Sequence, residues 1–376
     1  MSKGIEFLAP RLVGERFNNH AIPLEILKEL SVLEEMIVEV AKWKYLQDHQ
    51  DRQRVPRGFT DGISIKMTSI EDGSAIPKLA LFMACVTLLP PENQQYFEKA
   101  RDAIVNSVDA AERDETRITQ YLPTSLLVYF DKIGRGLRDN ESIEFNPSNQ
   151  DCPARLNRVS RHKLLEVSTI KEWTEETLER GLIPELDQEK KRFTLQLLNG
   201  SKVLIPIEPQ HKETVFEAFL GFDKNTRVIV HGIGRYNRAL KLETFDSLEH
   251  INILDPLDIS TRLSELSMLK DGWLDGKGLA PNKTGLDWLS KSFDENFRAD
   301  LPLPHIYPTP EGGVQAEWTI GTWEVSLEVD LGGKSADFQS VNIKTSKVDE
   351  TTFDLSNAES WTALNAKIDV LQKESV

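Results

Sequence analysis

The pattern of apolar and polar positions predicts helices and a hairpin in the first part of the chain. Apolar residues recur at helical spacing over 23–46 and 92–111, which predicts two amphipathic helices. Residues 63–70 alternate in polarity and, with the turn EDGS and the apolar stretch 76–88, predict a β-hairpin. A third helix and a short strand are predicted at 126–133 and 141–145. We therefore expect an N-terminal α+β domain over residues 1–150.

The central segment, residues 163–254, has the polarity pattern of a small β-barrel. Three strands are expected before a helix at 208–220, and two or three strands after it. The strands are predicted at 181–187, 192–198, 202–207, 227–236, 240–245 and 250–254, with a further possible strand at 164–170. A helix between the third and fourth strands is the element order of an OB-like barrel. The polar segment 146–162 ahead of it has the composition of a linker.

The last segment, residues 255–376, predicts a second α+β domain with an antiparallel sheet. Two helices are expected at its start, followed by a hairpin, a strand and a terminal helix. These elements are predicted at 259–269, from 281 onward, at 314–318 with 323–329, at 338–345 and at 358–371. The Gly-rich loop DGWLDGKGLAP separates the two helices. The predicted fold class is therefore α+β, with a central small barrel.

Composition and charge narrow the classes of function. The 376 residues carry a net charge of −15, and that field repels nucleic acid and anionic membranes unless basic residues cluster locally. No apolar run approaches the ~18 residues of a membrane span, the first residues lack a signal-peptide pattern, and there are two cysteines, so a cytoplasmic location is expected. Residues 301–376 hold five Lys, no Arg and twelve acidic residues. This excess predicts either a solvated surface or a docking face for a basic partner.

Two motifs in the second half resemble a family of uncharacterised bacterial proteins. The segment LSELSMLKDGWLDGKGLAP is similar to their DGW-x-G-x-G-x-AP loop, and PHIYPTPEGGVQAEW to their PTP-x-GG-x-x-x-EW hairpin. The resemblance covers residues 180–330. It implies a bacterial origin, a shared fold and a place among toxin–antitoxin or defence genes. It implies no catalytic residue, because the family has no established activity.

The motifs that carry chemistry are incomplete in this chain. LGGKS at 331–335 matches only the end of a phosphate-binding loop, so a turn is the favoured interpretation. Residues 232–237, GIGRYN, hold two of the three glycines of a dinucleotide fingerprint and are better explained as a barrel bend. The seven histidines include no i+3 or i+4 pair, although His231 and His250 could meet across neighbouring strands. We therefore predict no catalytic residue, no metal site and no cofactor.

Two groups of residues remain as candidate binding sites. A nucleic-acid site in the barrel would use Arg227, Arg235, Tyr236 and Arg238, with a second basic cluster at Arg52, Arg54 and Arg57. A partner-binding site would use Trp273, Asp275 and Lys277 of the Gly-rich loop. Solvated charge and a core position for the tryptophan are the structural alternatives.

The favoured hypothesis is a non-catalytic interaction protein with an unidentified protein partner. It would be antitoxin-like, or a component of a bacterial defence or toxin–antitoxin module. The alternatives are a nucleic-acid-binding protein that uses the barrel, and an enzyme whose site is assembled from residues scattered along the chain.

Overall fold

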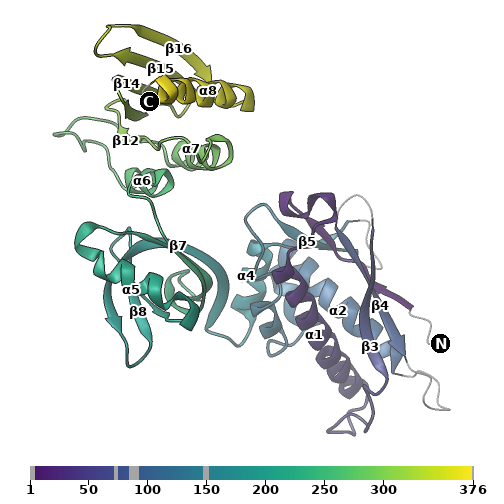
Figure 1. The fold of residues 1–376 in the computed structure, drawn as a ribbon. Helices are drawn as coiled ribbons and strands as arrows, with labels where there is room; N and C mark the ends of the chain where they lie inside the picture. The colour runs from purple at the N-terminus through teal and green to yellow at the C-terminus, as the bar shows by residue number, and fades with distance from the viewer. Residues whose placement is uncertain (1–4, 72–74, 84–92, 147–151, 375–376) are drawn as a thin grey trace. The chain divides into compact units, whose positions relative to one another are not determined.

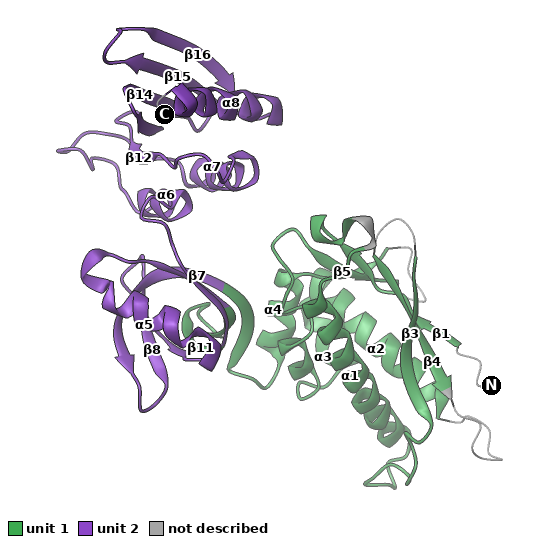
Figure 2. Ribbon diagram, in the orientation of Figure 1, with its two compact units in different colours: residues 1–177, 232–247 green, residues 178–231, 248–376 purple. Residues whose placement is uncertain are grey.

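The chain folds into a mixed α+β structure with several separate sheets. The computed structural model describes residues 5–71, 75–83, 93–146 and 152–374. These residues form two compact units: unit 1 holds residues 1–177 and 232–247, and unit 2 holds residues 178–231 and 248–376 (Figure 2). Three strands of one sheet pass from one unit into the other, so the chain enters each unit twice.

Helices form the centre of unit 1. They are α1 (Leu24–Asp48), α2 (Gln94–Arg113), α3 (Ile118–Tyr121) and α4 (Arg158–Val167), with 3-10 turns at Glu15–His20, Glu115–Arg117 and Leu127–Asp131. The predictions of α1 and α2 are confirmed, because the apolar stripe read from the sequence is the buried face of each helix. The helix predicted at 126–133 is only the short 3-10 turn.

Two three-stranded sheets flank these helices (Figure 1). One has the order β1-β4-β3 and the other β2-β5-β6, and all neighbouring strands are antiparallel. The strands are β1 (Ile5–Leu8), β2 (Arg11–Val13), β3 (Ile63–Glu71), β4 (Ile76–Met83), β5 (Ser142–Phe145) and β6 (Ala154–Leu156). The predicted hairpin is β3 and β4; residues 84–88 of that prediction lie outside the described residues.

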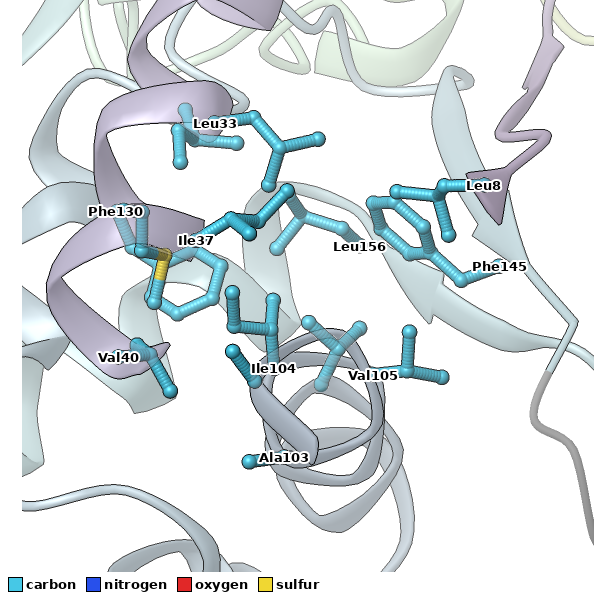
Figure 3. Close-up of a cluster of buried hydrophobic side chains, with 14 of the residues drawn as sticks. Leu8, Leu33, Ile37, Val40, Ala103, Ile104, Val105, Phe130, Phe145 and Leu156 are labelled. Carbon is cyan, nitrogen blue, oxygen red and sulfur yellow. The ribbon is translucent and has the colours of Figure 1, made fainter. Parts of the chain in front are cut away.

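The core of unit 1 joins the helices to the sheets. Ile37 and Val40 of α1 face Ile104 of α2, while Phe145 of β5 and Leu156 of β6 close the other side (Figure 3). Each of these side chains is at most 3% exposed. Burial of apolar side chains at this density is the main favourable contribution to folding of the unit.

Helix α4 is a correction to the prediction. Residues 158–162 were expected in a linker and 164–170 in a strand, yet Arg158–Val167 is helical. Asn157 caps the helix: its side chain accepts a hydrogen bond from Ser160 N, and Ser160 Oγ accepts one from Asn157 N, at 2.9 Å each. The strand prediction was wrong because the buried pair Leu164 and Leu165 fits a helix face equally well.

Five strands form a sheet that closes on itself. In chain order they are β7 (Glu172–Asp187), β8 (Arg192–Leu197), β9 (Lys202–Pro206), β10 (Val228–Asn237) and β11 (Leu242–Ile253). Their order in the sheet is β10-β11-β9-β8-β7, and helix α5 (Lys212–Leu220) connects the third strand to the fourth. The separate strands predicted at 240–245 and 250–254 are parts of the single strand β11.

The glycines predicted as a barrel bend lie within the continuous strand β10. A Cβ on Gly232 would lie 2.2 Å from Ser247 O, and one on Gly234 would lie 2.4 Å from Thr177 Oγ1. Side chains at these positions would collide with neighbouring segments of the sheet. Gly232 therefore allows close approach of the backbone at Ser247, and Gly234 leaves room for the Thr177 side chain.

The rest of unit 2 is an antiparallel five-stranded sheet with helices against it. The strands are β12 (His305–Pro308), β13 (Val314–Ile320), β14 (Trp323–Asp330), β15 (Ser335–Asn342) and β16 (Val348–Asp354), in that order across the sheet. The helices are α6 (Ile259–Leu266), α7 (Lys283–Asn296) and α8 (Ala358–Glu374). Trp318, Trp323 and Trp361 lie in its core. Strands β12 and β16 are not predicted from the sequence. The prolines around β12 and the polar residues of β16 do not give the pattern expected of a strand.

Candidate interaction site

The Gly-rich loop between α6 and α7 is a small structure held by its own backbone. Gly272 N donates to Gly278 O at 2.8 Å, and Leu274 and Lys277 exchange two hydrogen bonds of 2.9 and 2.8 Å. Asp275 and Gly276 form the turn between them, with φ of 48° and 80°. Asp-Gly is a preferred pair for a two-residue hairpin turn with positive φ at both positions. The loop is therefore ordered by local sequence.

Trp273 packs within this loop. A Cβ on Gly278 would lie 3.0 Å from Trp273 Nε1, so the indole rests directly on that glycine. Trp273 Nε1 donates to Leu279 O at 3.1 Å. The indole is half-buried, while Leu274 and Leu279 are 41% and 58% exposed. Trp273 thus stabilises the loop, and Leu274 and Leu279 are the apolar side chains that the loop exposes to solvent.

The loop is joined to a turn of the sheet that lies thirty residues away in sequence. Leu279 N donates to Pro310 O at 2.9 Å, in the turn between β12 and β13. Ala280 N donates to Asp271 Oδ1 at 2.9 Å and closes the base of the loop. The two motifs that carry the family resemblance are therefore neighbours in space.

A pocket of about 410 Å³ opens where the loop meets the sheet. Leu279, Ala280 and Asn282 form one wall, and the turns at 309–313 and 330–335 form the others. Four carboxylates lie along its lining: Glu311, Glu328, Asp330 and Asp337. Among the residues that the structure describes, none of the four pairs with a lysine or arginine within 4 Å. The lining of the pocket therefore carries negative charge that no lysine or arginine of the described residues neutralises by an ion pair.

The acidity extends over the outward face of the C-terminal sheet. Side chains alternate between the core and solvent along each strand, as the burial of β13 and β14 shows. The exposed carboxylates on the strands of this face are Glu317, Glu324, Glu328, Asp330, Asp337, Glu350 and Asp354. Glu328 stands directly opposite Asp337 across the β14–β15 ladder, a like-charge pair that weakens a sheet. Seven of the twelve acidic residues of 301–376 therefore share one face of the sheet.

LGGKS forms the turn between β14 and β15, as its context predicted. Asp330 Oδ1 accepts a hydrogen bond from Gly332 N at 2.9 Å, and Lys334 has φ of 53°. The ammonium group of Lys334 lies 5.3 Å from the centre of the Trp288 ring. The lysine therefore contacts an indole instead of a carboxylate of the pocket.

The arginines predicted for a nucleic-acid site make contacts within their own units, although Arg238 is exposed. Arg235 makes two hydrogen bonds to Asp246, at 2.9 and 2.6 Å, and lies 3.7 Å from Glu172. Arg238 donates to a backbone carbonyl, Ile170 O, at 3.1 Å. Tyr236 packs against the core of unit 1. Arg227, in unit 2, pairs with Glu265.

A buried carboxylate holds the Gly-Arg-Gly segment of unit 1. Glu29 of α1 is 6% exposed, and its two oxygens accept hydrogen bonds from Gly134 N and Gly136 N at 2.7 Å each. Burial raises the pKa of Glu29 to about 7, although both backbone hydrogen bonds act to lower it. A sequence signal existed, since position 29 falls within the apolar stripe of the predicted helix.

A second buried group links helix α4 to strand β7. The Arg161 guanidinium, 1% exposed, donates to the carbonyl oxygens of Phe130, Asp131 and Thr174 at 2.7–2.8 Å. Burial lowers the pKa of Arg161 to about 10, so it remains a cation at neutral pH. This role is not predicted from the sequence, because Arg161 falls in the polar segment 146–162 that has the composition of a linker.

Glu175 is the partner of this cation, with Arg161 Nη1 3.7 Å from its Oε1. It also receives hydrogen bonds from His162, Trp173 Nε1 and Arg158 Nη2. Burial would raise the pKa of Glu175, but the hydrogen bonds from His162 and Arg158 and the charges of His162 and Arg161 together lower it to about 2. Each buried charged group of this network has its hydrogen-bond partners within the fold, so we assign the network a structural role.

Three histidines of unit 2 lie near one another. His231 and His250 do meet across strands, with ring centres 6.1 Å apart, and His211 is 6.3 Å from His250. In the described part of the chain, no group of three or more His, Cys, Asp or Glu side chains is arranged to hold a metal ion. Nor does any helix of those residues combine the length and apolarity needed to cross a bilayer.

Comparison of the chain with protein-family models, with curated proteins and with solved structures finds no match in any of the three. The family resemblance of residues 180–330 therefore stays a prediction.

Proposed function

We propose that the chain is a non-catalytic interaction protein that binds a basic segment of a protein partner. The segment would dock on the Gly-rich loop and the adjoining acidic pocket of unit 2. One observation carries the proposal: Leu274 and Leu279 are exposed on an ordered loop, Leu279 lines the pocket, and no lysine or arginine of the described residues pairs with the carboxylates of that pocket. Exposed apolar side chains beside uncompensated charge are typical of a partner site.

The negative charge of the pocket favours a partner segment that carries lysine or arginine. A lysine or arginine of the partner would face Glu311, Glu328 and Asp337, and the apolar part of its side chain would contact Leu279. Because the loop is already held by its own hydrogen bonds, little ordering entropy is lost on binding. The place in a defence or toxin–antitoxin module that the resemblance implies stays a prediction.

A labelled peptide tests the proposal on the full-length chain. A fluorescent peptide of alternating Lys and Leu is expected to bind, and one of alternating Glu and Leu is not. Leu274→Ser with Leu279→Ser should weaken binding of the Lys–Leu peptide by about tenfold, because each leucine loses apolar contact. Leu220→Ser is the control, since Leu220 is 76% exposed on α5 and lies outside the proposed site.

A second pair of substitutions, Glu311→Gln with Glu328→Gln, tests the role of charge. It should weaken binding of the Lys–Leu peptide and reduce the salt dependence of that binding. Equal binding of the two peptides, or a double leucine variant that binds like the control, would contradict the proposal.

A second candidate function is nucleic-acid binding through the closed five-stranded sheet. Its support is the strand order: numbered along the chain the strands neighbour one another as 1-2-3-5-4, with a helix between the third and fourth, the arrangement expected of an OB-like barrel. The residues first assigned to that role are engaged in the fold. The exposed turn between β7 and β8, with Lys190 and Arg192, is a better place to test it.

A further inference from the structure

The C-terminal end of α1 carries a cluster of stacked aromatic rings. The His49 imidazole lies parallel to the Tyr45 ring, with 4.1 Å between centres and 13° between planes. Phe59 and Tyr96 meet Tyr45 edge-on, at 5.4 and 5.2 Å. His49 Nδ1 donates to Tyr45 O at 2.9 Å, which fixes the imidazole. Tyr45 is buried and His49 is half-buried, so His49 is the accessible end of the stack.

The loop that follows α1 is anchored beside this cluster. Val55 packs against the core of unit 1, and Phe59 is 3% exposed within it. Phe59 N donates to Pro56 O at 3.1 Å across a turn in which Gly58 has φ of 82°. Glycine at the third position of such a turn is required by its positive φ. The loop therefore has a fixed base, and its intervening side chains face solvent.

Three of those exposed side chains are arginines, and Asp51 and Gln53 are exposed beside them. Arg52, Arg54 and Arg57 are all exposed. Arg52 Nη1 donates to the Tyr45 hydroxyl at 2.8 Å, and its guanidinium lies 5.9 Å from the centre of that ring. Arg54 and Arg57 have no hydrogen-bond or ion-pair partner among the residues that the structure describes.

This arrangement differs from that of other arginines in unit 1. Arg16 is bound by Glu141 and Glu25, and Arg235 by Asp246, so their charge is neutralised within the fold. At the end of α1, the half-buried stacked imidazole of His49 is instead followed by a loop with three exposed arginines, one of which contacts Tyr45. Guanidinium forks match phosphate oxygens, and flat rings stack on nucleobases.

The geometry points to a binding site for single-stranded nucleic acid at the end of α1 and its following loop. Arg54 and Arg57 would contact the phosphodiester backbone, and a base would stack against His49 beside Arg52. A duplex would keep its bases stacked on one another and leave the imidazole unused. An acidic peptide would pair with the arginines but would gain nothing from the stacked ring. The net charge of −15 opposes any polyanion, so binding is expected at low ionic strength.

The test is fluorescence anisotropy of the full-length chain with labelled oligothymidylate over a range of salt concentrations. Arg54→Ala with Arg57→Ala should lower the slope of log affinity against log salt by about 1.4, since each lost phosphate contact on a single strand removes about 0.7. His49→Ala should weaken binding by about tenfold at unchanged slope, and His49→Phe should restore it because the flat ring returns. Thermal melting checks that each variant is folded.

The comparison variant is Lys190→Ala with Arg192→Ala, which removes two charges at the alternative site on the closed sheet, in the β7–β8 turn and at the first residue of β8. This variant should bind like the parent chain. Loss of binding in this variant alone would overturn the inference and move the site to the closed sheet. Stronger binding of a duplex than of the single strand, or binding of poly-glutamate without binding of oligothymidylate, would also overturn it.

Discussion

Two regions of the molecule handle their carboxylates in opposite ways. In unit 1, Glu29 and Glu175 are buried, and every oxygen has a donor from the fold. On the C-terminal sheet of unit 2, Glu328 and Asp337 are exposed, stand opposite one another and have no cation within 4 Å among the described residues. The first arrangement fixes loops and strands. The second leaves its charge available to a partner.

The comparison teaches how to separate structural from functional charge when no motif helps. A buried charge costs several kcal/mol to desolvate and persists only when the fold supplies its partners. An exposed charge costs little, so a one-sign surface need not be compensated by the fold. Buried charges whose hydrogen-bond partners all come from the fold therefore indicate a structural role. Exposed charges of one sign without ion-pair partners indicate where binding is worth testing.

The largest expected effect comes from the buried cation. Arg161→Ala removes the donor to three carbonyl oxygens and leaves Glu175 with one cation fewer. We expect the free energy of unfolding in urea to fall by about 3–5 kcal/mol. Arg192→Ala, an exposed arginine, should change it by less than about 0.5 kcal/mol. Similarly small changes in the free energy of unfolding of both variants would contradict the proposed difference between buried and exposed charges.

The next effect is a pH dependence carried by Glu29. Its folded pKa of about 7 lies above the usual value of 4.5 for a glutamate, so its stabilising contribution is fully present below pH 4.5 and is lost as pH rises through 7. The loss amounts to about 3 kcal/mol. Glu29→Gln should remove it, seen as a flatter plot of unfolding free energy against pH between 4.5 and 8. The exposed Glu328→Gln should leave the profile unchanged, and parallel profiles for parent and Glu29→Gln would refute the assignment.

A smaller effect tests the rigidity of the Gly-rich loop. Gly276 and Gly278 both have positive φ, but a Cβ meets the Trp273 indole only at Gly278. Gly278→Ala should therefore destabilise the loop by about 1–3 kcal/mol and Gly276→Ala by about 1 kcal/mol. Hydrogen exchange at the amides of Gly272 and Leu274 measures the difference. Equal exchange in the two variants would mean that the indole does not rest on Gly278.

The smallest effect concerns the acidic face. Glu328→Gln relieves the repulsion from Asp337 and should raise the unfolding free energy by about 0.2–0.5 kcal/mol at low salt, with no gain at high salt. Glu295→Gln should have the opposite sign, because Glu295 lies 3.4 Å from Lys291 on α7. A loss of stability in Glu328→Gln would show that its charge is compensated.

The sequence by itself determined the elements whose signal is local. The helical stripes of α1 and α2 and the strands of the hairpin β13–β14 follow from periodicity, since one face of each is buried. The Asp275-Gly276 turn follows from the backbone preferences of that pair. Composition also located the acidic excess in the last fifth of the chain, although not that seven of its carboxylates share one face of a sheet.

Only the tertiary structure decided which distant residues meet. Nothing local joins Glu29 to Gly134, Arg161 to Thr174, or Leu279 to the turn at Pro310. The same holds for function: Arg235 and Arg54 look alike in sequence, but Asp246 neutralises the first and no described residue pairs with the second. Periodicity records the burial of an element's own face, whereas the pairing of charges depends on loops and registers that bring separate segments together.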